Sequence, residues 1–98
     1  MQLDDELCLC FHVTKRKVLN FLRVERPRVA SQMSECFGAG TGCGWCRPYL
    51  RKLFDASQNA EVAAAENDLP DVSDYEAGRT SYVKSGGGTP PPGATPVD

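Results

Sequence analysis

The chain has 98 residues, which is room for one small domain and excludes a second independent core. Hydrophobic residues make up only 41% of it, and the nine Gly and seven Pro indicate that part of the chain stays unpacked. The net charge of −2 is unevenly divided, because residues 1–54 have nine Lys and Arg against five Asp and Glu, whereas residues 55–98 have two against eight. No apolar run reaches the roughly 18 residues of a membrane span, and the acidic start does not look like a signal peptide, so we expect a cytoplasmic protein without a membrane segment.

The first predicted helix begins at Thr14, a residue type that caps helix N-termini through its hydroxyl. Val18, Phe21 and Leu22 follow at spacings of three and four residues, which predicts one buried stripe. Pro27 ends this helix, because proline has no N–H to continue it.

A second, short helix is predicted over residues 27–37. Pro27 suits its first position, and Val29, Met33, Cys36 and Phe37 fall on one helical face.

The glycine-rich residues 38–42 predict a loop, since glycine loses the most backbone entropy on ordering. A third helix is expected to start between Cys43 and Cys46 and to run to Phe54. It tolerates Pro48 in its first turn and buries a face that includes Leu50.

Beyond residue 54 the composition changes. The apolar residues of 60–67 are nearly all alanine, which buries little surface, and eight of the fourteen residues 85–98 are Gly or Pro. We therefore predict an all-α domain of about three short helices over residues 1–54, followed by an acidic, disordered tail over residues 55–98.

The pattern that indicates chemistry is Cys8-x-Cys10 followed, after thirty-two residues, by Cys43-x-x-Cys46. An odd number of cysteines in a chain expected in the cytoplasm argues against a disulfide framework. A helical hairpin can bring the two pairs together, and free N–H groups at a helix start stabilise thiolates. Four thiolates bind either zinc or an iron–sulfur cluster; the tight first pair and the glycine-rich loop favour iron–sulfur, and zinc stays open.

These residues also carry a resemblance. Cys8-Leu9-Cys10, then Val13-Thr14 at a helix start, then Ala39 through Pro48 around the second pair resemble the bacterioferritin-associated ferredoxin family, the BFD-like [2Fe–2S]-binding domain. The resemblance covers about residues 7–54. It implies a small helix-turn-helix-like fold with one [2Fe–2S] cluster, whose ligands and metal-binding residues are Cys8, Cys10, Cys43 and Cys46.

The resemblance implies electron transfer as the function. Stand-alone members donate electrons to bacterioferritin so that stored iron is released, and other members lie inside larger proteins such as assimilatory nitrite reductases. We expect a monomeric electron carrier whose partner is a redox protein, either bacterioferritin or a reductase. The alternative is a non-redox interaction module whose zinc or iron–sulfur site only stabilises the fold.

Other functions find no support in the residues. We expect no enzyme activity of the chain itself, because nothing resembles an acid–base pair, an activated nucleophile or a phosphate loop. Nucleic acid is not expected as a partner, since the basic residues are not interleaved with stacking aromatics.

Three side chains near the predicted ligands have two interpretations each. Cys36 is expected to be a small core residue rather than a spare ligand. His12 is expected to be exposed or to support the site without replacing a cysteine. Trp45, between the second pair of ligands, is either an exposed binding residue or a lid over the cluster.

The basic residues of the first half are a candidate docking face for an acidic protein partner, unless they only balance the charge of the cluster. The acidic tail is a further candidate to cover this face. The basic residues are Lys15, Arg16, Lys17, Arg23, Arg26, Arg28, Arg47, Arg51 and Lys52.

Overall fold

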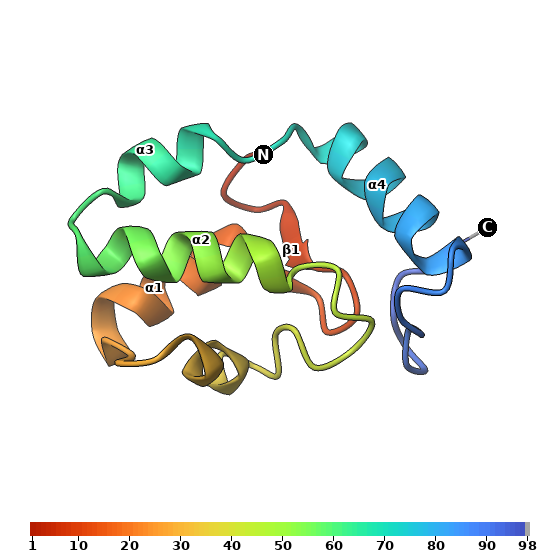
Figure 1. The fold of residues 1–98 in the computed structure, drawn as a ribbon, viewed down its shortest axis with the longest axis horizontal. Coiled ribbons are helices and arrows are strands. Elements are labelled where there is room, and N and C mark those ends of the chain that lie inside the picture. The colour runs from red at the N-terminus through yellow and green to blue at the C-terminus, as the bar shows by residue number, and fades with distance from the viewer. Residues whose placement is uncertain (98) are drawn as a thin grey trace.

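The computed structural model describes residues 1–97. Its elements, in chain order, are β1 (Glu6–Cys8), β2 (Val13–Thr14), α1 (Lys15–Glu25), the 3₁₀-helix η1 (Ala30–Glu35), α2 (Arg47–Gln58), α3 (Val62–Asn67) and α4 (Val72–Lys84). Helix α2 runs through the middle of the molecule and packs against α1, η1 and α3, while α4 lies at the far end (Figure 1). The fold is mostly helical.

Helix α1 confirms the predicted start at Thr14. The Thr14 side chain accepts a hydrogen bond of 3.2 Å from the backbone N–H of Lys17. Val18 and Leu22 are buried as the spacing predicts, and the helix ends at Arg26 in a left-handed conformation just before Pro27.

The second predicted helix forms as the 3₁₀-helix η1 rather than as an α-helix. Met33 and Cys36 are buried, but Val29 and Phe37 are 54% and 67% exposed. A 3₁₀-helix repeats every three residues, so positions 33 and 36 share a face while 29 and 37 lie off it. The side chain of Gln32 accepts hydrogen bonds from the preceding backbone, the shortest being 2.6 Å, and so holds this tight turn.

Helix α2 corresponds to the third predicted helix. It begins slightly later than expected, at Arg47, with Cys46 as its N-cap. Pro48 lies in its first turn, where its missing N–H costs nothing. Leu50 and Leu53 are buried against the other helices and form the centre of the core.

The two short strands correct the all-α prediction. β1 pairs with β2 in an antiparallel ladder, with Glu6 opposite Thr14 and Cys8 opposite Val13. Leu7 and Val13 are at most 1% exposed, so burial of these two side chains holds the ladder together. The turn between the strands presents the first cysteine pair.

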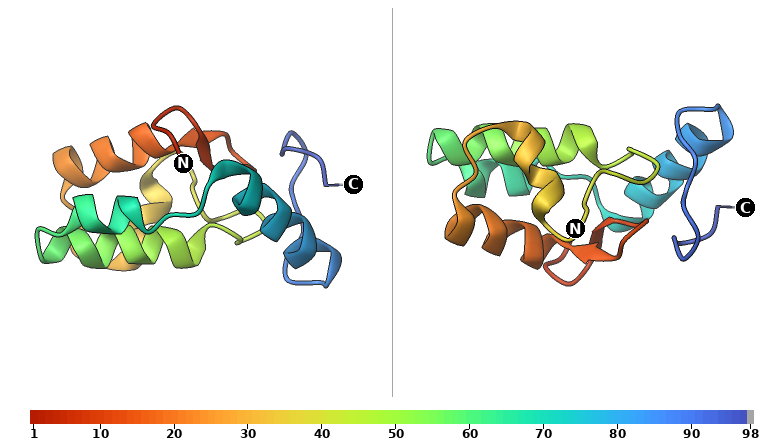
Figure 2. Two further views of the ribbon diagram at one scale, coloured as in Figure 1. Left: turned by 90° about the horizontal axis from the view of Figure 1, so that it is seen from above. Right: turned by 90° about the horizontal axis from the view of Figure 1, so that it is seen from below.

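Residues 55–97 differ from the low-order tail that their composition predicts, and residue 98 lies outside the described part. They form the end of α2, then α3 and α4, after which the chain turns back along the same end of the molecule (Figure 2). Composition did not predict these helices because only a few apolar side chains of this segment are buried. These are Ala65, Leu69 and Tyr75. The Tyr75 hydroxyl donates a hydrogen bond of 2.5 Å to the Leu7 carbonyl in β1.

Ion pairs also join the acidic half to the basic half. Glu66 lies 3.0 Å from Lys15, which is 7% exposed, and Asp68 lies 3.7 Å from Lys52. Lys15 is therefore a buried partner of α3 rather than part of an open basic face. Among residues 1–97, no helix combines the length and the apolar character needed to cross a membrane.

Candidate metal centre

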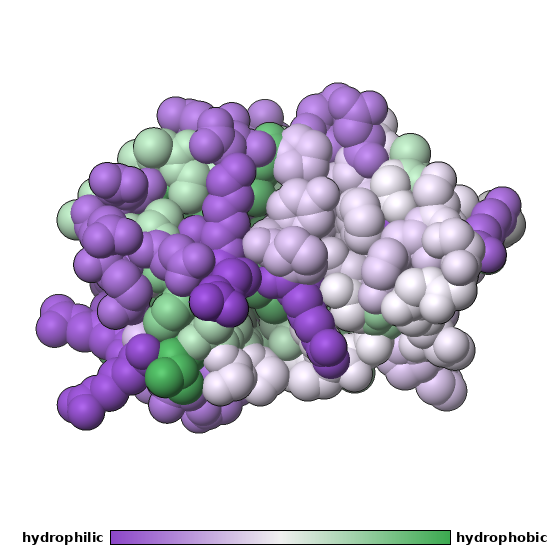
Figure 3. Space-filling model, in the orientation of Figure 1, coloured by the Kyte–Doolittle hydropathy of each residue, from purple (hydrophilic) through white to green (hydrophobic). Residues whose placement is uncertain are grey.

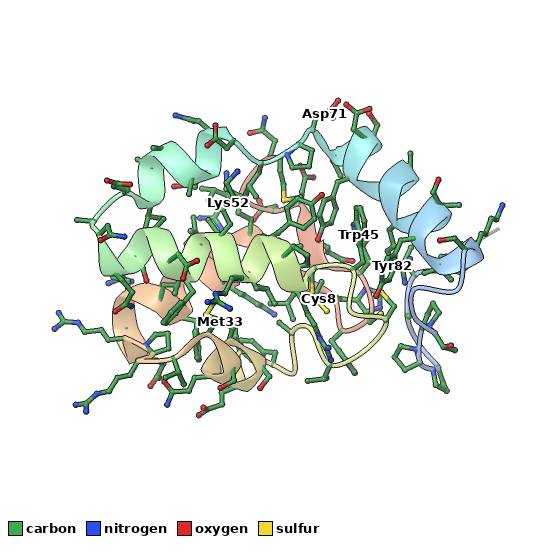
Figure 4. All side chains as sticks on the ribbon, viewed as in Figure 1. Cys8, Met33, Trp45, Lys52, Asp71 and Tyr82 are labelled. Atoms are coloured by element: carbon green, nitrogen blue, oxygen red, sulfur yellow. The ribbon has the colours of Figure 1, made fainter. Side chains whose placement is uncertain are left out.

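The four predicted cysteines meet at the end of the molecule that faces α4. Cys8 ends β1 and Cys10 lies in the following turn, whereas Cys43 lies in the glycine-rich loop and Cys46 caps α2. All four are at most 7% exposed and line one small enclosed space. Figure 4 shows Cys8 beside the N-terminal end of α2, with Trp45 and Tyr82 between α2 and α4.

The thiols form two contacting pairs, each with one member from either sequence motif. Cys8 pairs with Cys46, and Cys10 pairs with Cys43, whose backbone N–H lies 3.3 Å from the Cys10 sulfur. In the described residues, 1–97, no three His, Cys, Asp or Glu side chains are gathered as a site for a single metal ion. The two cysteine motifs thus contact each other through the backbone of Cys43 and the sulfur of Cys10.

The pKa values of Cys8 and Cys46 shift in opposite directions. A hydrogen bond from the Cys46 thiol lowers the pKa of Cys8 to about 5, and it outweighs the opposing effect of burial. The same hydrogen bond, together with burial, raises the pKa of Cys46. Thiolate is the form that binds metal, so a lowered pKa at Cys8 favours metal binding there.

The second pair lies beside a cation. Burial raises the pKa of Cys10. Burial also acts to raise the pKa of Cys43, but the backbone N–H of Trp45 and the guanidinium of Arg79 outweigh it and leave this pKa lowered. The Arg79 side chain, on α4, reaches to 3.7 Å from the Cys10 sulfur.

One glycine of the loop is required by close approach. A Cβ on Gly42 would lie 2.6 Å from the Cβ and 2.7 Å from the sulfur of Cys10, so no larger residue fits without moving Cys10. Glycine at this position therefore lets the loop backbone approach Cys10.

Trp45 forms an aromatic cluster with three tyrosines. Its ring centroid lies 5.6 Å from that of Tyr49, 5.7 Å from Tyr75 and 5.5 Å from Tyr82. A Cβ on Gly78 of α4 would lie 2.8 Å from the Trp45 ring, which fixes how closely the helix packs. Trp45 is therefore half-buried beneath α4, and it lines the enclosed space rather than projecting freely from the surface.

Cys36 and His12 lie outside the enclosed space. Cys36 is 1% exposed, with its thiol 3.7 Å from the Lys17 carbonyl, which agrees with a core role. His12 is exposed and contacts the Gly93 carbonyl at 2.7 Å and the Glu6 carboxylate at 3.0 Å. Both acceptors favour the imidazolium, and the Gly93 contact contributes most to the raised pKa of His12.

The chain beyond α4 covers one side of the cysteine loops. The Thr95 N–H donates to the Leu9 carbonyl at 2.8 Å, and the Tyr82 hydroxyl donates to the Cys43 carbonyl at 2.7 Å. Gly88 packs directly on that Cys43 carbonyl, where a Cβ would lie 1.9 Å from the oxygen. The surface over this end is of intermediate hydropathy, and most of the strongly hydrophilic side chains gather over the other end of the face in Figure 3.

Sequence reasoning missed Tyr75, Arg79 and Tyr82. A usable signal was present, because they are spaced four and three residues apart after Asp71, which caps α4 by accepting from the Ser73 N–H at 3.2 Å. The predicted basic face is also dispersed: the turn between α1 and η1, with Arg26 and Arg28, lies at the end of the molecule opposite α4 (Figure 1).

The sequence pattern of the BFD-like [2Fe-2S] binding domain matches residues 7–56. The chain belongs to this family. The BFD-like chain is also similar to two curated fungal proteins, both nitrite reductases [NAD(P)H]. It is 34% identical over 69 residues to that of Emericella nidulans and 29% identical over 73 residues to that of Neurospora crassa. These matches cover 68% and 74% of the chain and 6% of each relative, and no solved structure matches it.

The cofactor of a BFD-like domain is a [2Fe–2S] cluster, and the residues here fit it. The donor set is four cysteine thiols in one enclosed space. Within residues 1–97, Arg79 Nε and Trp45 Nε1 are buried donors with no hydrogen-bond partner, and both residues line that space. Sulfur atoms of a cluster are acceptors of the kind that such donors require.

Proposed function

We propose that Cys8, Cys10, Cys43 and Cys46 are the ligands of the [2Fe–2S] cluster and that the chain carries single electrons between protein partners. The observation that carries the proposal is the meeting of these four buried thiols in one enclosed space. When bound, such a cluster accepts and releases one electron. On this proposal the chain catalyses no reaction of its own.

The residues around the thiols would hold and shield them. The Cys43 N–H donates to the Cys10 sulfur, which favours the thiolate. Helix α4 and the segment that follows it cover Cys43 through Tyr82 and Gly88 and limit the access of water. Low exposure of ligands stabilises a cluster against loss and lets the protein set its potential.

For the partner we propose a redox protein, and two candidates have separate support. The family resemblance favours bacterioferritin, to which the chain would donate electrons for iron mobilisation. The curated relatives favour a reductase, because both are nitrite reductases [NAD(P)H]. The chain matches only 6% of each relative, so the rest of such an enzyme would be the partner.

One experiment distinguishes these partners. The reduced, cluster-loaded chain is mixed anaerobically with iron-loaded bacterioferritin in the presence of a ferrous chelator, and in parallel with a nitrite reductase that lacks its own BFD-like domain. Release of ferrous iron at a rate proportional to chain concentration supports bacterioferritin. Reoxidation of the chain by the reductase alone assigns the reductase, and reoxidation by neither protein contradicts both partner proposals.

A non-redox interaction module is the competing function. Reduction with dithionite followed by air reoxidation separates the two, because a carrier must lose and regain its visible absorption over repeated cycles. Zinc gives no such absorption, and a purely structural cluster has no need to survive the cycles.

A further inference from the structure

Arg79 is a buried arginine that the family match does not include. It lies in the middle of α4, is 2% exposed, and falls outside residues 7–56. Its Nη2 lies 3.7 Å from the Cys10 sulfur and its Nη1 donates to the Thr95 carbonyl at 2.9 Å. Its Nε is one of the two buried donors without a partner in the described residues, the other being Trp45 Nε1.

Within the described residues, 1–97, the charge of Arg79 has no carboxylate partner. The ion pairs within residues 1–97 do not include this side chain, and it is the cation among the residues that line the space between the cysteines. A buried charge is stable only beside a compensating charge. A group beside the guanidinium that can carry negative charge is the sulfur of Cys10, which lies 3.7 Å from Nη2.

Three contacts fix α4 so that Arg79 faces this sulfur. Tyr75 binds the carbonyl next to Cys8, Tyr82 binds the carbonyl of Cys43, and Gly78 packs on Trp45. Tyr75 thus anchors the helix beside Cys8, and Tyr82 anchors it beside Cys43. The guanidinium is thus held in place by its helix and does not depend on an exposed, mobile side chain.

We propose that Arg79 is a positioning residue that sets the reduction potential of this centre in favour of the reduced state. This inference rests on the proposed function. Four thiolates, two ferric ions and two sulfides sum to −2, and one electron from an external donor brings the total to −3 with no bond made or broken and no proton moved. A fixed positive charge in a poorly solvated site stabilises the more negative state, so it favours uptake of the electron.

The test is a redox titration of the full chain, reconstituted with iron and sulfide under anaerobic conditions. Arg79→Gln removes the charge and keeps an amide donor, Arg79→Lys keeps the charge, and Lys84→Gln is the matched control because Lys84 is exposed on the same helix. Visible absorption is followed against potential with dithionite and mediators. For Arg79→Gln we expect the ratio of reduced to oxidised protein at a fixed potential to fall at least tenfold, which is 59 mV for a one-electron couple.

The controls separate charge from packing. Lys84→Gln is expected to change the ratio less than twofold, and Arg79→Lys to stay within threefold of the wild type. The Arg79→Gln shift should persist at 0.5 M NaCl, because a buried charge is poorly screened. Equal ratios for Arg79→Gln and Lys84→Gln, or an equal loss in Arg79→Lys and Arg79→Gln, would overturn the proposal.

Two further measurements keep the outcomes distinct. Far-UV circular dichroism reports whether each variant folds, and Arg79→Met replaces Arg79→Gln if the latter does not. A wild-type chain that takes up no iron and sulfide contradicts the proposed function itself. A wild-type chain that cycles normally while the uncharged variants keep its potential contradicts only the role of Arg79.

Discussion

Replacing Tyr75 by Phe tests the docking of α4, the largest difference between the sequence-based expectation and the structure. Tyr75 is 1% exposed, and its hydroxyl binds the Leu7 carbonyl 68 residues away. Tyr75→Phe keeps the ring and its edge-on contact with Tyr49, whose centroid lies 4.9 Å away, and removes only the hydroxyl. Loss of a buried hydrogen bond that leaves its acceptor unpaired costs about 1 to 3 kcal/mol of unfolding free energy.

The assay is thermal unfolding of the full chain followed by circular dichroism at 222 nm. For a domain of this size, 1 kcal/mol lowers Tm by about 4 to 8 °C, so Tyr75→Phe should unfold at least about 4 °C below the wild type. Tyr82→Phe is the matched control; its hydroxyl is only partly buried, so a smaller decrease is expected.

A Tyr75→Phe chain that unfolds within 1 °C of the wild type would refute this reasoning. It would mean that the hydrogen bond from Tyr75 to the Leu7 carbonyl does not help to hold α4 against β1.

Three further outcomes follow from the structure. Burial raises the pKa of Tyr75 above its ordinary value of 10.0, so above pH 10 the folded chain keeps a proton that the unfolded chain releases. The contribution of this phenol to stability is therefore complete below pH 10. Above pH 10 the free energy of unfolding, measured by urea titration, should fall by up to about 1.4 kcal/mol per pH unit, and Tyr75→Phe should flatten this slope. Gly88→Ala should lift the covering segment off Cys43 and speed bleaching of the cluster by an iron chelator, with the exposed Thr89→Ala as control. Cys36→Ala should lower the unfolding free energy by about 1 kcal/mol and leave the iron content and visible spectrum unchanged.

Each of these outcomes has a clear opposite. An unchanged slope in Tyr75→Phe above pH 10 would show that this phenol titrates normally and is not buried. Equal bleaching rates for Gly88→Ala and Thr89→Ala would mean that the segment after α4 does not protect the site. Loss of iron in Cys36→Ala would make Cys36 part of the ligand set.

The elements that local residues determine could be predicted. Thr14 caps α1 through its own hydroxyl, and Pro48 marks the first turn of α2 because only there is its missing N–H harmless. That the four cysteines lie together could be predicted in the same way, since a helical hairpin can bring two close pairs to one place.

The parts that depend on distant contacts could not be predicted. Spacing alone does not separate an α-helix from a 3₁₀-helix, and the side chain of Gln32 decides the matter for η1. The low apolar content of residues 55–97 hides Tyr75 and Arg79, whose partners lie near residues 7 to 10. Only the folded chain reveals that these few side chains suffice to dock α4.

Iron and sulfide analysis of the reconstituted chain, combined with its visible spectrum before and after dithionite, tests the cluster most directly. We expect two irons and two acid-labile sulfides per chain, with a visible absorption that bleaches on reduction and returns on reoxidation. A Cys43→Ser chain should fail to reach this stoichiometry. One zinc per chain with no visible absorption, or full iron and sulfide content in Cys43→Ser, would contradict a [2Fe–2S] cluster held by Cys8, Cys10, Cys43 and Cys46.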